Sequence, residues 1–114
     1  MHEASLAQNI IEDLKRRIEQ GEIPDRVRTV NLAVGRLTAV VPDNLRFLFE
    51  VLAKGSALEG ARLDIEQVPI RARCTSCGEY FEIEDVYFSC RRCGSADLDV
   101  LSGSELLIES VEVG

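Results

Sequence analysis

Cys74-Thr75-Ser76-Cys77-Gly78 and Cys90-Arg91-Arg92-Cys93-Gly94 are the two stretches that decide how this chain folds. They contain the only four cysteines of the sequence, and about a dozen residues separate the two pairs. Two residues between thiols allow both sulfurs of a pair to face one point, and two such pairs can form a tetrahedral cage. The spacing therefore predicts a metal site, with these ligands: Cys74, Cys77, Cys90 and Cys93.

Zinc is the metal that we expect in this site, because a closed site of four thiolates suits a redox-inert ion. Iron fits the same ligands, as in rubredoxin-like proteins, and stays an alternative. Two disulfides are less consistent with the sequence, because both pairs share the frame Cys-x-x-Cys-Gly and no secretory segment is expected. Gly78 and Gly94 tolerate the positive φ that lets a backbone N–H face a ligand sulfur.

The composition describes a small acidic protein. Its 114 residues suit one domain with a small metal-bound appendage. The formal net charge of -7 argues against a protein that binds duplex nucleic acid through many phosphate contacts. No apolar run approaches the ~20 residues of a membrane span, so we expect a cytoplasmic protein without a membrane partner.

Hydrophobic periodicity predicts two amphipathic helices. The first covers residues 4–20, and its apolar face is formed by Leu6, Ile10, Ile11, Leu14 and Ile18. The second is expected to run from Pro42 to Lys54, with Asp43 or Asn44 as its capping residue.

Alternating apolar residues predict three strands around these helices. Residues 27–35 form the first, and the tail, 105–113, forms the last. Between them, residues 63–72 alternate with a change of register, which predicts one strand with a bulge at Glu66-Gln67. Pro69 indicates that part of this strand lies at a sheet edge.

These elements predict an α+β fold, in which two helices cover a small three-stranded sheet and a zinc-knuckle domain of zinc-ribbon type, with four cysteine ligands, is inserted. We expect residues 1–72 to form the α/β domain, completed by the C-terminal strand within 96–114. Residues 73–95 form the predicted zinc-binding domain.

The amino terminus offers a second kind of metal chemistry. The α-amine of Met1, the backbone nitrogen and imidazole Nδ1 of His2, and the backbone nitrogen of Glu3 are four donors in sequence. Four nitrogens in a plane suit Ni(II) or Cu(II). A lone histidine is more often inert, so these residues alone leave open both a nickel site and an ordinary chain start.

Two other functions fit the cysteine pairs. Arg71, Arg73, Arg91 and Arg92 give the knuckle a local positive charge, as in a zinc-ribbon module that binds protein or nucleic acid. We favour solvated arginines that balance the negative cage. A rubredoxin-like electron carrier is the second alternative. An enzyme is not expected, because the chain has no second histidine, nucleophile motif or phosphate-binding glycine loop.

Over essentially its whole length, the chain resembles the HypA family of NiFe-hydrogenase maturation proteins. The features that carry the resemblance are Met1-His2-Glu3, the first helix, the strand ending at Gly35, the second helix ending before Gly55-Ser56, and both Cys-x-x-Cys motifs. The combination in this order is more specific than any of its parts.

The resemblance implies a nickel metallochaperone, not an enzyme. Such a protein works with a HypB-like GTPase and delivers Ni(II) to the large subunit of NiFe-hydrogenase, and some relatives also serve urease. Carried onto this chain, the nickel ligands would be Met1, His2 and Glu3. The ligands of a structural Zn(II) would be Cys74, Cys77, Cys90 and Cys93. A nucleic-acid partner is not expected.

Overall fold

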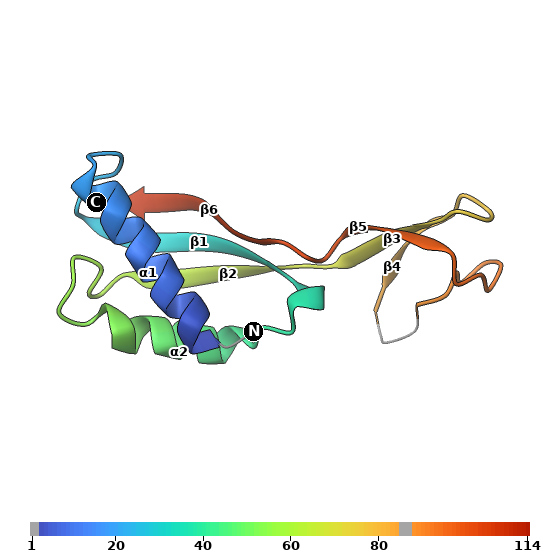
Figure 1. Cartoon of the computed structure of the whole chain (residues 1–114), viewed down its shortest axis with the longest axis horizontal. Helices are drawn as coiled ribbons and strands as arrows, with labels where there is room; N and C mark the ends of the chain where they lie inside the picture. The colour runs from blue at the N-terminus through green and yellow to red at the C-terminus, as the bar shows by residue number, and fades with distance from the viewer. Residues whose placement is uncertain (1–2, 85–87) are drawn as a thin grey trace.

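Two three-stranded sheets at opposite ends of an elongated molecule form the framework of the chain (Figure 1). The computed structural model describes residues 3–84 and 88–114 and measures 54 × 25 × 18 Å along its principal axes. The wide lobe contains both helices and the sheet β2-β1-β6, and the narrow lobe contains the sheet β4-β3-β5 with the cysteines.

Both predicted helices are present in the wide lobe. α1 spans Glu3–Glu19 and α2 spans Pro42–Ala53. One face of α1 is buried, and its residues are Leu6, Ala7, Ile10, Ile11 and Leu14. The buried residues of α2 are Leu45, Phe49 and Ala53. The spacing of three and four residues puts each set on one side of its helix, so both helices contribute to one core.

The start of α2 differs from the prediction. Val41 occupies the N-cap position and no side chain caps the helix, so capping by Asp43 or Asn44 is wrong. Pro42 at the first helical position lacks an N–H and already has a helical φ, which allows the helix to begin there. Asp43 lies in the first turn instead, and its carboxylate accepts a hydrogen bond from the Arg46 guanidinium at 2.7 Å.

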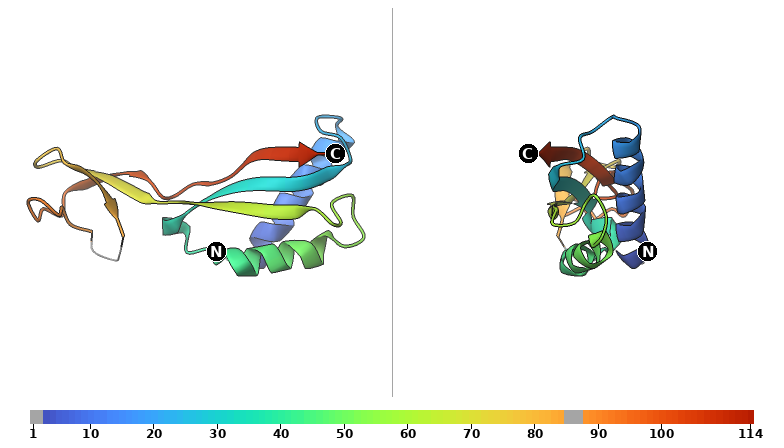
Figure 2. Two further views of the ribbon diagram at one scale, coloured as in Figure 1. Left: turned by 180° about the vertical axis from the view of Figure 1, so that it is seen from behind. Right: turned by 90° about the vertical axis from the view of Figure 1, so that its left-hand side faces the viewer.

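The sheet of the wide lobe is built around β1 (Val27–Gly35). β2 (Arg62–Val68) pairs with it in parallel, and β6 (Leu106–Val113) pairs with it antiparallel. A parallel pair needs a crossover connection, which here contains the 3-10 helix η1 (Arg36–Thr38) and α2. Figure 2 shows α1 along one side of this sheet and α2 at its lower edge.

The register of the sheet places its apolar residues in rows. The rows are Val30, Leu63 and Val111, followed by Leu32, Ile65 and Ile108. These side chains belong to the same core as the buried helix faces. The predicted three-stranded sheet covered by two helices is therefore confirmed.

The prediction of one bulged strand over residues 63–72 is wrong. β2 ends at Val68, and β3 (Ile70–Cys74) begins after Pro69 in the other sheet. Proline has no N–H for the strand ladder, so the hydrogen bonding of the first sheet stops there. β3 lies between β4 (Tyr80–Ile83) and β5 (Leu98–Ser102), and both pairs are antiparallel. The domain boundaries at 73 and 95 remain a prediction. The sheet β4-β3-β5 extends beyond both of them, because β3 begins at Ile70 and β5 ends at Ser102.

A tight junction connects the two lobes. The backbone N–H of Gly35 donates to the Glu105 carbonyl at 2.7 Å, and that of Leu37 donates to the Gly103 carbonyl at 2.8 Å. A Cβ at Gly35 would lie 1.9 Å from the Gly103 carbonyl oxygen, so only glycine allows this approach. The junction thus fixes η1, which leads into α2, against the linker between β5 and β6.

Candidate metal centre

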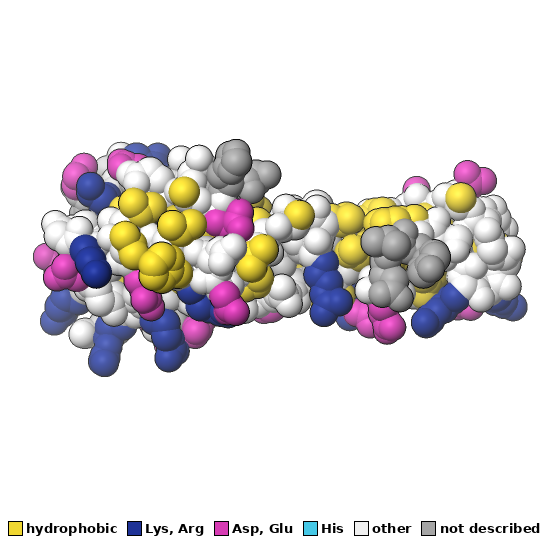
Figure 3. Space-filling view, turned by 90° about the horizontal axis from the view of Figure 1, so that it is seen from below, with side chains coloured by type: hydrophobic (Ala, Val, Ile, Leu, Met, Phe, Trp, Pro, Cys, Tyr) yellow, Lys and Arg dark blue, Asp and Glu magenta, His cyan; other side chains and the backbone are white. Residues whose placement is uncertain are grey.

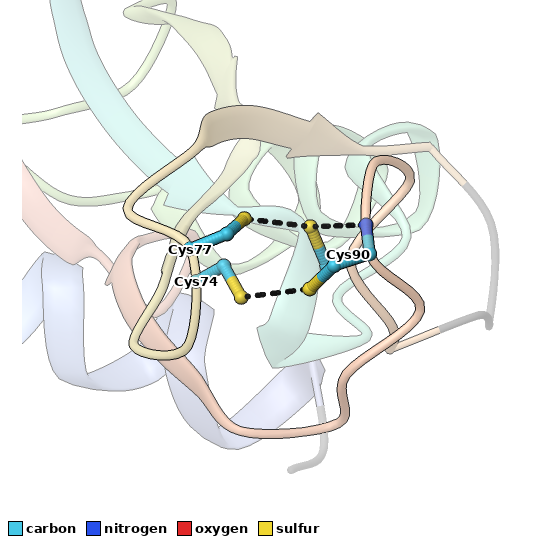
Figure 4. A group of neighbouring side chains, drawn as sticks. Cys74, Cys77 and Cys90 are labelled. Atoms are coloured by element: carbon cyan, nitrogen blue, oxygen red, sulfur yellow. Dashed lines mark hydrogen bonds between the residues drawn. The ribbon is translucent and has the colours of Figure 1, made fainter.

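The four cysteine sulfurs converge on one point in the narrow lobe. They lie within 4.8 Å of one another, and two separations, Cys74 to Cys93 and Cys77 to Cys90, are each 3.6 Å. A tetrahedron with metal–sulfur distances of ~2.3 Å has sulfur–sulfur edges of about 3.8 Å. A disulfide needs ~2.05 Å. The arrangement therefore fits a four-coordinate ion such as zinc, and all four thiols are free. Figure 4 shows the side chains of Cys74, Cys77 and Cys90 in this arrangement.

The first knuckle follows β3. Cys74 is its last residue and is fully buried, whereas Cys77 is exposed in the turn that follows. Gly78 has a φ of +80°, and its N–H donates to the Cys74 carbonyl at 2.8 Å. This conformation directs the next N–H, that of Glu79, toward the Cys77 sulfur. The predicted use of a glycine after each pair is thus explained: it orients the following amide.

The second knuckle repeats this turn. The backbone N–H groups of Arg92 and Cys93 both donate to the Cys90 sulfur at 3.4 Å. Gly94 has a φ of +77°, and its N–H donates to the Cys90 carbonyl at 2.8 Å. The Cys93 N–H is the largest influence on the pKa of the Cys90 thiol; together with Arg92 it outweighs desolvation and lowers that pKa to about 6. These two N–H groups thus favour the thiolate form of Cys90, which is the form that binds a metal ion.

The sulfurs also oppose one another's ionisation. The Glu79 N–H favours the thiolate of Cys77, but desolvation and the neighbouring sulfurs raise its pKa to about 12. The pKa of Cys93 is raised as well: the Ser95 N–H lowers it, but the Cys74 sulfur and desolvation outweigh that bond. Four thiolates at this separation need a cation to neutralise their charge. The donor set thus fits a divalent metal ion.

Side chains outside the two motifs tie the knuckles together. The hydroxyls of Ser76 and Ser95 are 3.0 Å apart, and the Thr75 hydroxyl donates to the Asp97 carbonyl at 2.9 Å. Sequence analysis missed these contacts, because they join residues about twenty positions apart that belong to no repeating pattern. They connect the two turns through groups other than the cysteine sulfurs.

The proposed nickel ligands at the amino terminus are only partly within the described residues. Met1 and His2 lie outside them, so the predicted site is not tested. Glu3 is the first residue of α1 and is half-buried. It lines a hollow of about 360 Å³ between the two helices, together with Ala4, Asn44, Phe47 and Leu48.

The outer surface of α2 beside this hollow is apolar. Phe47 is 64% exposed and Val51 is 43% exposed, although the core side of the helix is fully covered. Figure 3 shows the resulting apolar patch over α2. The amino-terminal end of α1 thus adjoins an exposed hydrophobic surface.

Over residues 1–113, the chain matches the protein family described as "Hydrogenase/urease nickel incorporation, metallochaperone, hypA". The chain belongs to the HypA family. The hydrogenase maturation factor HypA of Desulfatibacillum aliphaticivorans is 47% identical over 113 residues, which cover 99% of this chain and 87% of that protein. HypA of Streptomyces avermitilis is 45% identical over 112 residues, covering 97% and 86% of the two chains.

Two solution structures of HypA proteins have the same fold. The nickel metallochaperone HypA from Helicobacter pylori aligns with a TM-score of 0.67 at 23% identity, covering 99% of this chain and 97% of the other. A second HypA structure aligns with a TM-score of 0.70 at 22% identity and covers 99% and 96%. At these identities the likeness supports the fold alone.

Membership of the HypA family confirms the predicted family and general role. The family consists of metallochaperones for nickel incorporation during hydrogenase maturation, and it is not a catalytic family. Its role implies partners in that maturation pathway. In the described part of the chain, neither helix combines the length and apolar character that crossing a bilayer requires.

Proposed function

We propose that this chain binds Ni(II) at its amino terminus and delivers it to the large subunit of NiFe-hydrogenase. The ligands are Met1, through its α-amine, His2 and Glu3. A HypB-like GTPase acts with it, and urease maturation proteins are a second group of partners. Membership of a family of nickel-incorporating metallochaperones is the observation that carries the proposal.

The start of α1 supports this choice of ligands. The first N–H groups of a helix have no acceptor within the helix, and α1 begins at Glu3. The backbone nitrogen of Glu3 is therefore available to lose its proton to a metal without breaking a helical hydrogen bond. Together with the donors of Met1 and His2 it completes the four nitrogens that planar Ni(II) prefers.

A site at a chain end also suits transfer of its metal. The α-amine and the imidazole can be displaced one after the other by ligands of a recipient protein, because no fold has to open first. Glu3 adjoins the exposed apolar surface of α2, where a recipient can lie close to the metal. Protonation of the nitrogen donors provides a second route to release.

The four cysteines have a different role in the proposal: they hold a structural Zn(II). The hydrophobic cluster of the narrow lobe, within the described residues, has three buried members, Ile70, Ala72 and Ile83. So small a cluster cannot stabilise a separate lobe, whereas a structural zinc site contributes folding free energy directly. The zinc therefore stays with the protein while the nickel is transferred.

The test compares His2→Ala with protein that keeps its natural first residue. Both are loaded with zinc, titrated with Ni(II), and analysed for both metals after gel filtration. We expect about one nickel per chain in the natural protein and none in the variant, with equal zinc in both. The visible absorption of planar Ni(II) should be absent from the variant.

A matched control is Glu22→Ala, which removes an exposed carboxylate from the turn after α1. It should bind nickel like the natural protein. A second test adds a long glycine–serine extension before Met1, which places the chain's α-amine too far from His2 to share a metal ion with it. Full nickel stoichiometry in this extended protein would place the nickel elsewhere.

A further inference from the structure

The sheet of the narrow lobe has one buried face and one open face. Ile70 and Ala72 of β3 are buried, and they lie opposite Ile83 and Phe81 of β4. Successive side chains of a strand point to opposite faces. The residues between them therefore form the open face. In the strand register, Arg71 lies opposite Glu82 and Arg73 lies opposite Tyr80.

We propose that this open face is a docking surface for an acidic segment of a partner protein that carries an apolar anchor residue. We call it the arginine face and define it by Arg71, Arg73, Tyr80 and Leu101. The proposal is independent of where nickel binds.

The apolar part of the arginine face is exposed and contains a hollow. Tyr80 is 67% exposed and Leu101 is 56% exposed. Leu101 lies at an irregularity of the β3–β5 pairing, where Arg71 faces Ser102 but Ala72 faces Val100. A hollow of about 340 Å³ opens on this face, and its lining includes Arg71, Tyr80 and Leu101 as well as the carboxylate of Glu82. It has the size to accept one apolar side chain.

The charged part of the face is available to a partner. The Arg73 guanidinium lies 5.9 Å from the centre of the Tyr80 ring, which holds the cation over an aromatic surface. Among residues 3–84 and 88–114, neither Arg71 nor Arg73 takes part in an ion pair. Exposed tyrosine and arginine in one hollow are typical of residues that dominate protein interfaces.

The spacing of the arginines specifies the partner. Residues two apart in a strand are separated by about 7 Å, so two carboxylates at that distance would meet both guanidinium groups. Asp99, opposite Arg73 in β5, and Glu82 lie beside the arginines. A continuous row of phosphates would be repelled by these carboxylates, whereas a protein segment can place its charges selectively. The arrangement therefore favours a protein partner over nucleic acid.

Selection from a random peptide library displayed on phage tests the proposal, using the zinc-loaded protein as the target. We expect the enriched peptides to combine aspartate or glutamate with a large apolar residue. Binding of the enriched peptides should weaken about tenfold or more in the double variant Arg71→Glu/Arg73→Glu. Tyr80→Ser should weaken binding without changing the net charge.

The matched control is Arg26→Glu/Arg28→Glu, which makes the same charge change on exposed residues of the wide lobe. It should bind the peptides like the parent protein. Zinc content and thermal unfolding establish that each variant is folded, and Arg71→Gln/Arg73→Gln replaces the charge reversal if that variant is not.

Three results would overturn the proposal. The first is enrichment of no peptide, or of basic ones. The second is equal binding by the parent and the arginine variants. The third is tighter binding of a 20-nucleotide single-stranded DNA than of any selected peptide, which would make the face a nucleic-acid surface.

Discussion

Gly35→Ala is the substitution whose effect the structure predicts most directly. Gly35 has a φ of -74° and a ψ of 148°, which alanine adopts without strain. The new Cβ would nevertheless lie 1.9 Å from the Gly103 carbonyl oxygen and 2.1 Å from its carbon, and both atoms belong to the backbone. The linker between β5 and β6 must therefore move by more than 1 Å to bring this contact beyond 3.0 Å.

This displacement breaks the junction between the lobes. The two hydrogen bonds from Gly35 and Leu37 each contribute about 1 kcal/mol of net stability. Overpacking adds about 1–3 kcal/mol. We therefore expect Gly35→Ala to lower the free energy of unfolding by about 3–5 kcal/mol, a large part of the ~5–15 kcal/mol of a typical domain.

Urea unfolding followed by far-ultraviolet circular dichroism measures this change. The control is Gly60→Ala, because Gly60 has a φ of +84° but no atom within 4 Å of a new Cβ. Its left-handed conformation alone should cost about 1 kcal/mol. If Gly35→Ala is no less stable than Gly60→Ala, the close approach at the junction does not exist in solution.

Three further predictions concern the metals. Removal of zinc with a chelator should unfold the narrow lobe and leave the wide lobe intact; in an NMR spectrum the Val30 and Leu32 amides would keep their positions, and their loss would contradict separate stabilisation of the lobes. Zinc binding at pH 7.5 should release about three to four protons, because the narrow lobe is unfolded without zinc and each of its four thiols then has an ordinary pKa of ~8.5 and is mostly protonated. Calorimetry across several buffers measures this number. Release of only about two protons would show that the cysteines keep their folded arrangement without zinc, in which the pKa of Cys90 is lowered to about 6. Nickel affinity should fall from about pH 7.5 to about 5.5 as the imidazole is protonated, and unchanged affinity would exclude nitrogen ligands.

Local patterns in the sequence determined the helices, the strands of the wide lobe and the grouping of the four cysteines. Each depends on residues a few positions apart: the three- and four-residue repeat of α1, the alternation of β1, and the two residues between the thiols of each pair. Such short-range geometry follows from the backbone itself and survives in any fold that contains the segment. At Met1, His2 and Glu3 the local pattern offers four nitrogen donors, and only the resemblance to the HypA family implies that they bind nickel.

Only the tertiary structure decided how distant segments meet. The end of β2 at Pro69, the pairing of β3 with β5, and the contact of Gly35 with Gly103 all join parts of the chain that share no repeating pattern. The arginine face exists for the same reason, because its members come from three strands. The physical cause is that a strand's alternation specifies which side chains are buried, whereas its partner is chosen by backbone hydrogen bonds and packing across the whole chain.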